Sequence, residues 1–219
     1  MTRLIVFDCD GTLVDSQQLI VEAVRQTLLA HDLEPLPADA VRTVIGLSLD
    51  LALGKLVPDA DPAMLASLVD TYRTSWRALR AQGVREPLFP RTREVLGTLD
   101  ERGHLLGIAT GKSRPGLIDV LDHHGLTALF ASLQTADRHP SKPHPGMLEA
   151  AMRETGSEPA ATIMVGDTGF DMEMARNAGA RAIGVAWGYH PTALLEAAGA
   201  EIVLERFDQL VDLVDGTAG

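Results

Sequence analysis

Acidic side chains in two segments of the chain have a spacing that could bind a hard cation and supply a reactive carboxylate. Asp8 and Asp10 follow the apolar run Leu4–Phe7, and on an extended chain two residues apart their side chains point the same way. Asp167 follows a second apolar run, Ala161–Val165. Two unit charges 4 Å apart repel by about 4 kcal/mol at an effective dielectric of 20. These carboxylates, once brought together, therefore need a cation, a proton or both.

The ligand atoms on offer favour Mg²⁺ as that cation. Mg²⁺ takes oxygen ligands, keeps several waters and binds substrate phosphate directly. His139 and His144 flank Lys142, and a zinc pair there is conceivable, but a proline-rich loop that fixes the lysine is the favoured interpretation. Cys9 is the only cysteine, and between two carboxylates we expect it to pack as a small hydrophobic residue with a raised thiol pKa.

Groups that bind anions are predicted beside the carboxylates. Lys142 can neutralise a phosphate oxygen as a point charge. Thr110, with the amides of Gly111 and Lys112, is expected to open a helix, and a helix N-terminus binds anions. The side chain of Lys112 could equally point to solvent. Carboxylates, a metal, a lysine and helix amides around one cavity are typical of a phosphoryl-transfer site.

The first segment itself suggests how such a reaction would run. A carboxylate nucleophile such as Asp8 forms an aspartyl-phosphate, which divides one difficult step into two easier ones. Asp10 shares charge with its neighbour and is placed to hold a proton for the leaving oxygen. Gly11 then supplies a tight turn, and Thr12 supplies a hydroxyl donor.

The elements that must position these residues form a repeating pattern of strand and helix. Continuous apolar runs predict buried parallel strands, at Leu4–Phe7, Leu105–Ala109, Ala161–Val165, Ala182–Ala186 and, more weakly, Glu201–Leu204. Helical spacing predicts helices between them, at 91–102, 114–124, 144–155, 169–178 and 192–198. This alternation is typical of a doubly wound, parallel α/β sheet, in which ligands gather at the carboxyl ends of the strands.

Residues 16–87 interrupt that pattern. Apolar residues there recur at helical spacing and no convincing strand appears. We therefore predict an all-α cap domain at 16–87, inserted into a catalytic core made of residues 1–15 and 88–219.

Four segments together resemble the motifs of the haloacid dehalogenase superfamily, in the branch with a helical cap inserted after the first strand. They are Asp8–Ser16, Thr110–Lys112, Lys142–Pro143 and Gly166–Thr168 with Asp171. The resemblance covers essentially the whole chain and implies a Rossmann-like core.

The resemblance also implies roles for these residues. Asp8 is the expected nucleophile, Asp10 the expected acid and base, and Asp8, Asp10 and Asp167 the expected Mg²⁺ ligands. Asp10 would bind the metal through its backbone carbonyl, and Asp171 would support the site. Thr110 and Lys142 are expected to be catalytic. The expected substrate-binding residues are Gly11, Thr12, Gly111 and Lys112.

Within the superfamily the chain looks most similar to phosphoglycolate phosphatases, which implies a small phosphorylated metabolite as substrate. Ile45 and Leu49 replace basic residues of the β-phosphoglucomutases. A phosphonoacetaldehyde hydrolase would need a cap lysine, and Lys55 is the only one. A pyrophosphatase and a non-catalytic binding module are further alternatives. Arg42 is a candidate partner for a substrate carboxylate.

Composition limits the partners further. With 19 Lys and Arg against 30 Asp and Glu, the net charge is −11, which argues against a nucleic-acid partner. No apolar run approaches the ~20 residues that span a bilayer. The first residues read as a buried strand, not a signal peptide, so we expect a cytoplasmic protein, monomeric or homodimeric.

Overall fold

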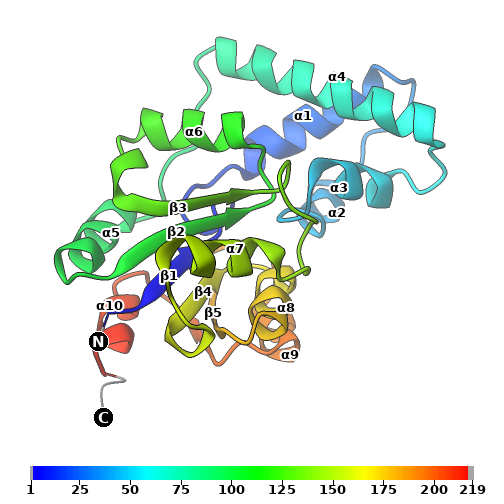
Figure 1. The fold of residues 1–219 in the computed structure, drawn as a ribbon. Helices are drawn as coiled ribbons and strands as arrows, with labels where there is room; N and C mark the ends of the chain where they lie inside the picture. Colours follow the sequence, from blue (N-terminus) through cyan, green and yellow to red (C-terminus); the bar gives the residue numbers. More distant parts are fainter. Residues whose placement is uncertain (1, 217–219) are drawn as a thin grey trace.

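The computed structural model describes residues 2–216, and its centre is a six-stranded, fully parallel sheet in the order β3-β2-β1-β4-β5-β6 (Figure 1). The strands are β1 (Leu4–Phe7), β2 (Leu105–Thr110), β3 (Phe130–Thr135), β4 (Thr162–Gly166), β5 (Arg181–Val185) and β6 (Ile202–Leu204). The order reverses beside β1, so the sheet is doubly wound, as the sequence predicted. The five predicted strands are confirmed, with ends that differ by at most one residue.

Helices cover both faces of this sheet, which explains why the central strands are apolar throughout. On one face Ile5 and Phe7 of β1 pack with helices α5, α6 and α10. On the other face Leu4 and Val6 pack with α7, α8 and α9. The helices are α5 (Thr92–Glu101), α6 (Arg114–His123), α7 (Gly146–Thr155), α8 (Gly169–Asn177), α9 (Thr192–Ala198) and α10 (Gln209–Gly216). The five predicted core helices are confirmed.

Strand β3 and helix α10 were not predicted. Strand β3 lies at the edge of the sheet and alternates buried and exposed positions, so it lacks a continuous apolar run. Three of its buried residues are polar, and two of them, Ser132 and Gln134, donate hydrogen bonds to Glu154 Oε2 on α7, at 2.6 and 2.8 Å. A strand whose inward residues are satisfied by a neighbouring helix cannot be recognised from hydrophobicity alone.

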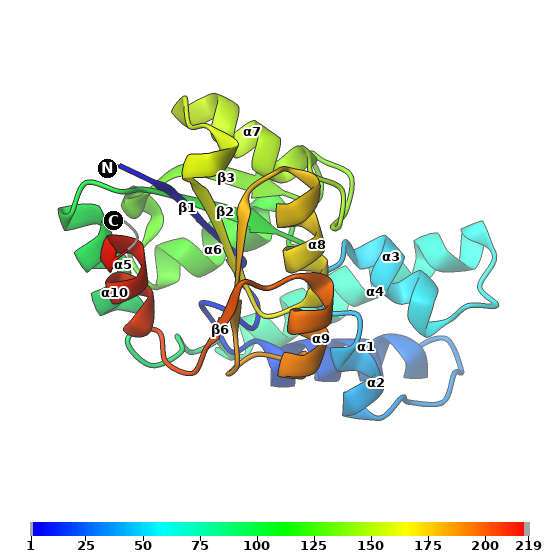
Figure 2. The same cartoon turned by 90° about the horizontal axis from the view of Figure 1, so that it is seen from below.

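The segment between β1 and α5 is helical, with α1 (Gln17–Leu29), α2 (Ala38–Arg42), α3 (Leu49–Leu56) and α4 (Pro62–Ala81). Both views place α2 and α3 beyond the carboxyl ends of the strands (Figures 1 and 2). Among residues 2–216 no helix is long and apolar enough to cross a membrane. The exact division at residues 15 and 88 stays a prediction.

Candidate active site

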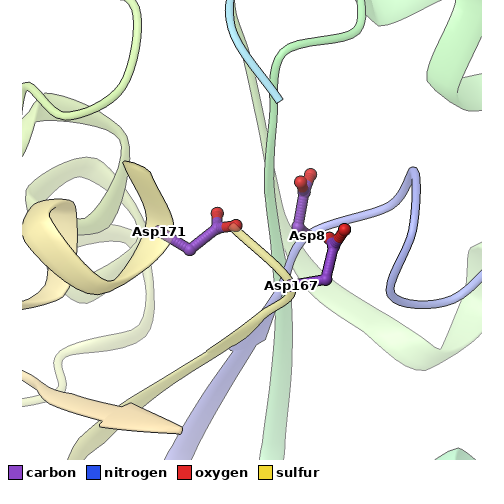
Figure 3. Close-up of side chains that lie close together, drawn as sticks. All are labelled: Asp8, Asp167 and Asp171. Carbon is purple, nitrogen blue, oxygen red and sulfur yellow. The ribbon is translucent and has the colours of Figure 1, made fainter. Parts of the chain in front are cut away.

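Three carboxylates meet at the carboxyl ends of the two central strands (Figure 3). Asp8 follows β1, Asp167 follows β4, and Asp171 projects toward both from the first turn of α8. One oxygen from each lies within 4.8 Å of the others, and all three residues are fully buried. The sequence predicted that the side chains of Asp8, Asp10 and Asp167 would meet. The structure brings Asp8 and Asp167 together with Asp171, and the prediction is wrong for the side chain of Asp10, which turns to Lys112 instead.

Lys142 lies between two of these carboxylates. Its Nζ is 3.0 Å from Asp8 Oδ2 and 2.5 Å from Asp171 Oδ1, and the side chain is fully buried. Burial alone would lower the pKa of Lys142, but Asp171 and Asp8 raise it above its usual value. For Asp8, burial raises the pKa to about 7 in spite of the opposing effect of Lys142. The lysine is therefore a permanent cation beside the predicted nucleophile.

Local structure at the start of α8 holds Asp171 in place. Thr168 is the N-cap of this helix, and its backbone N–H donates to Asp171 Oδ2 at 3.1 Å while Asp171 N donates to Thr168 Oγ1 at 3.4 Å. This reciprocal pair is a capping box. One carboxylate oxygen thus satisfies the helix end and the other faces Lys142, which fits the supporting role that the sequence predicts for Asp171.

Asp167 is enclosed on every side. Its Oδ1 accepts a hydrogen bond from Thr12 Oγ1 at 3.0 Å, and its Oδ2 accepts one from Tyr189 N at 2.9 Å. A Cβ added to Gly11, whose φ is +82°, would lie 2.2 Å from the carboxylate, and one added to Gly188 would lie 2.1 Å from Asp167 Cβ. Only glycine allows this close approach. The hydroxyl of Thr12, predicted to bind substrate, is engaged with Asp167.

The donor atoms of this cluster fit Mg²⁺. All are oxygens, as a hard cation prefers. Asp8 Oδ2 is buried and makes no well-directed hydrogen bond to any described residue, although Lys142 Nζ is close. Burial, followed by the charges of Asp8 and Asp171, raises the pKa of Asp167 far above its usual value. A divalent cation would relieve this excess of negative charge.

The side chain of Asp10 lies outside the cluster. Its Oδ1 is 2.9 Å from Lys112 Nζ, and Glu86 Oε1 is 3.7 Å from the same nitrogen. The ammonium also lies 4.8 Å from the centre of the Trp76 ring on α4. Lys112 thus points inward with a side chain only 9% exposed, which resolves the alternative of a solvent-facing lysine. A metal contact through the backbone carbonyl of Asp10 stays a prediction.

The segment after β2 differs from the predicted helix N-terminus. Helix α6 begins at Arg114 with Ser113 as its N-cap, so the amides of Gly111 and Lys112 precede the helix. The Lys112 amide donates to Thr110 Oγ1 at 3.3 Å. The prediction that these amides open a helix is wrong, because the chain makes a short turn before α6 starts. Thr110 itself is fully buried at the end of β2.

The loop between α2 and α3 rests on the core close to the site. A Cβ added to Gly111 would lie 2.4 Å from the Leu47 carbonyl oxygen, so glycine permits this contact. Ser48 N donates to Ser141 Oγ at 2.8 Å, next to Lys142. The inserted helices are therefore seated on two of the four motifs.

Sequence reasoning missed the role of Glu86 in the site. Glu86 lies in the segment between α4 and α5, is 2% exposed and pairs with Arg80 of α4. Arg80 also pairs with Asp119 of α6. An isolated glutamate in a polar connection gives no sequence signal of burial. By contrast, the turn after β5 that carries Gly188 and Tyr189 could have been suspected, because it too follows a strand at the active edge.

Three minor predictions concern residues around the site. Cys9 is buried, and burial followed by the charge of Asp10 raises its thiol pKa, as predicted. Arg42 pairs with Asp39 on its own helix at 2.6 Å. Lys55 is exposed, with its Nζ 5.6 Å from the centre of the Phe170 ring.

The two histidines have separate partners. His139 Nε2 lies 2.8 Å from Gln134 Oε1, and His144 Nδ1 accepts a hydrogen bond from Gly146 N at 3.1 Å. Within residues 2–216, the only grouping of His, Cys, Asp and Glu that could hold a metal is the carboxylate cluster.

Known proteins resemble this chain over nearly its whole length. The sequence model of the family described as "Haloacid dehalogenase-like hydrolase" matches residues 5–185. A Dickeya dadantii (strain 3937) protein named "Probable phosphatase IndB" is 37% identical over 215 residues, which cover 96% of this chain and 93% of that protein. A phosphoglycolate phosphatase of Vibrio vulnificus (strain YJ016) is 29% identical over 219 residues, covering 97% and 96%. A solved hydrolase structure from Pseudomonas syringae matches with a TM-score of 0.87 at 28% identity, covering 100% of both chains.

Proposed function

This chain belongs to the haloacid dehalogenase-like hydrolases and is a phosphatase, and from that premise we propose that it hydrolyses a small phosphate monoester through a covalent phosphate on Asp8. The observation that carries the proposal is the buried cluster of Asp8, Asp167 and Asp171 with Lys142 at its centre. Such a cluster costs folding free energy, because clustered buried carboxylates repel one another. A bound cation would offset this cost, which is why the cluster supports a ligand-binding site.

In the first step a carboxylate oxygen of Asp8 attacks phosphorus, and the bond from phosphorus to the ester oxygen breaks. Lys142, 3.0 Å from Asp8 Oδ2, stabilises negative charge on the phosphoryl group. The carboxyl of Asp10 gives its proton to the departing alcohol. Asp10 lines the cavity beneath the cap helices, where the alcohol portion would lie. Lys112 orients the Asp10 side chain by direct contact.

In the second step a water oxygen attacks phosphorus and the bond to Asp8 breaks, which restores the carboxylate and releases inorganic phosphate. Asp10 accepts the proton of that water, so its protonation state also returns to the start. One residue thus acts as acid and then as base. No proton is gained or lost by the protein over the full cycle.

We propose Mg²⁺ as the metal, held by the carboxylates of Asp8 and Asp167 and by the backbone carbonyl of Asp10. When bound, it would neutralise charge on the phosphoryl group and on the carboxylates. Asp171 supports these residues through Lys142. The likeness to proteins named phosphoglycolate phosphatase makes 2-phosphoglycolate the first substrate to test.

Two other reactions of the superfamily receive less support. A phosphonate hydrolase of this kind would need a cap lysine in the cavity, whereas among the described residues Lys55 is not part of the cavity lining. For a sugar-phosphate mutase, the positions that carry basic residues are here Ile45 and Leu49, both in the lining.

The test is phosphate release from a panel of monoesters, with sugar phosphates and pyrophosphate included, in the presence and absence of Mg²⁺. We expect metal-dependent turnover that Asp8→Asn abolishes and that Asp59→Asn, a change at an exposed position of the cap, leaves intact. Acid quenching of the reaction with ³²P-labelled ester should trap hydroxylamine-sensitive label on the unmodified protein. Turnover that survives Asp8→Asn would contradict the proposal.

A further inference from the structure

A cavity of about 870 Å³ lies between the cap helices and the core. Ligand pockets usually range from about 300 to 1,000 Å³, so this one is near the upper end. Its core side includes Asp10, Gly111 and Lys112, and continues over the start of α6 and the segment after β3. The cavity therefore starts at the residue that we propose as the acid and extends away from phosphorus, into the space that the alcohol portion of the substrate would occupy.

The cap side of the cavity is mainly apolar. Aliphatic side chains from α1, α2, α3, α4 and the loop before α3 line it, namely Ile20, Val24, Val41, Ile45, Leu53 and Val69. Tyr72 and Trp76 of α4 add two rings stacked at 6.1 Å between centroids. Burial of this surface against an apolar ligand would be favourable, because it removes apolar area from water.

The charges of the lining provide no surplus for an anion. Four lining residues are basic, Arg73, Arg77, Arg80 and Lys112, and four are acidic, Asp10, Asp50, Asp119 and Asp137. Both of the well-buried cations, Arg80 and Lys112, are already paired, and Arg77, whose only polar partner among the described residues is the Arg73 carbonyl, is exposed to solvent.

Those pairs involve carboxylates of the core and of the connection between α4 and α5. Lys112 pairs with Asp10, and Arg80 pairs with Glu86 and Asp119. A carboxylate on the alcohol portion would therefore lose its hydration without gaining an unpaired buried cation, which is costly.

The size of the cavity does not come from a cap lifted off the core. The Leu47 carbonyl approaches Gly111 too closely for a Cβ to fit, and Ser48 N donates to Ser141 Oγ. Gly46, whose φ is +100°, also lies close to Thr168: an added Cβ would lie 3.2 Å from Thr168 Cγ2. The loop thus already touches the second and fourth motifs, and Ser141 next to the third, while the cavity remains.

We propose that this cavity binds the alcohol portion of the substrate and selects a bulky, uncharged and predominantly apolar one over glycolate. The inference rests on the proposed function, since it concerns the leaving group of the same reaction. Glycolate is a two-carbon acid, and it would leave most of the cavity unfilled while bringing a second negative charge to the apolar lining.

Three esters that differ in size and charge test this inference. We expect kcat/KM for 2-phenylethyl phosphate to exceed that for 2-phosphoglycolate at least tenfold. Adding a carboxylate to the ring, in 2-(4-carboxyphenyl)ethyl phosphate, should remove most of that advantage. The two esters are of nearly the same size, and they differ mainly in this charge. A preference for 2-phosphoglycolate, or equal rates for all three, would overturn the inference and leave the phosphatase reaction intact.

A cation placed in the lining should reverse the selection. Val69→Arg puts a guanidinium on the cavity side of α4, and we expect it to raise the ratio of the carboxyphenyl ester to the phenyl ester at least tenfold. Leu51→Arg is the matched control, because Leu51 is a 48% exposed residue of the same cap outside the lining. The same ratio change in both variants would overturn the inference.

Binding separates the pocket from the chemistry. Titration calorimetry of Asp8→Asn with Mg²⁺ should show tighter binding of 2-phenylethyl phosphate than of 2-phosphoglycolate, with a more negative heat-capacity change. If the protein binds in this order but the unmodified protein hydrolyses none of the esters, the proposed reaction is contradicted and the proposed binding pocket is not. The opposite order of affinities would contradict the proposed selectivity of the pocket and leave the proposed reaction intact.

Discussion

Two lysines with low exposure each lie between two carboxylates, and their surroundings differ. Lys142 contacts Asp8 and Asp171, and all three side chains are completely buried inside the core. Lys112 contacts Asp10 and lies 3.7 Å from Glu86, at the edge of the cavity between cap and core. The first lysine joins a strand end to a helix N-terminus, whereas the second joins a strand end to the connection that leaves the cap.

This difference assigns the two lysines different tasks. The Lys142 group is formed entirely by elements of the core, which suits a nucleophile whose position must not vary. The Lys112 group includes Trp76 and Glu86, which belong to the cap and its connection. The orientation of Asp10 therefore depends on how the cap is seated, while that of Asp8 does not.

The largest expected effect comes from removing Lys142. Lys142→Met leaves the carboxylates of Asp8 and Asp171 buried without their cation, and breaking such a pair costs about 3–5 kcal/mol of unfolding free energy. Urea denaturation measures this loss, and activity should disappear as well. Adding Asp171→Asn should recover part of the stability, because one unpaired charge is removed. A loss under 1 kcal/mol would show that the three groups are not coupled.

Mg²⁺ should stabilise the folded protein. Metal bound at a hundred times its dissociation constant contributes about 2.7 kcal/mol, or about 5–10 °C in Tm for a chain of this size. Differential scanning calorimetry with MgCl₂, against NaCl of equal ionic strength, measures the shift. Asp167→Asn should lose most of it, whereas Asp39→Asn at the exposed end of α2 should keep it. A shift unchanged by Asp167→Asn would place the metal elsewhere.

Removing Lys112 should have a smaller effect on stability and a specific effect on rate. Lys112→Met leaves Asp10 and Glu86 without their shared cation, at a cost of about 1–3 kcal/mol. The misplaced Asp10 should lower kcat by about 10–100-fold. In Asp10→Asn the further change Lys112→Met should have little effect on kcat, since the two act together. Fully additive losses would mean that Lys112 acts independently of Asp10.

The smallest expected effect tests the contact between the loop before α3 and Gly111 of the core. Gly111→Ala forces the Leu47 carbonyl away, because the new methyl would lie 2.4 Å from it, and overpacking of this kind costs about 1–3 kcal/mol. Gly97→Ala is the matched control, with nothing within 4 Å of the added Cβ in the interior of α5. It should gain about 0.5–1 kcal/mol, since alanine favours the helix. Chemical denaturation of both variants measures the contrast, and equal effects would contradict the observed contact.

The sequence was sufficient for most of the fold because the central strands are buried on both faces. A strand such as Leu4–Phe7 must be apolar at every position, so it can be recognised locally. The edge strand Phe130–Thr135 could not be recognised in this way, since Ser132 and Gln134 are buried against Glu154 from another element. The predicted cytoplasmic location and oligomeric state stay predictions.

For the site, the sequence by itself determined that Asp8 and Asp167 follow strand ends and hence meet, whereas Lys142 follows a strand that was not predicted and was assigned to the site by the resemblance of its motif. The meeting of Asp8 and Asp167 depends on the parallel direction of their strands, which the alternation of apolar runs and helices predicts. Tertiary structure alone decided that Lys112 turns toward Asp10 and that Glu86 lies beside it. It also decided the size and charge of the cavity. These contacts join residues far apart in the chain, and they depend on how the cap helices pack against the core, for which no local sequence pattern exists.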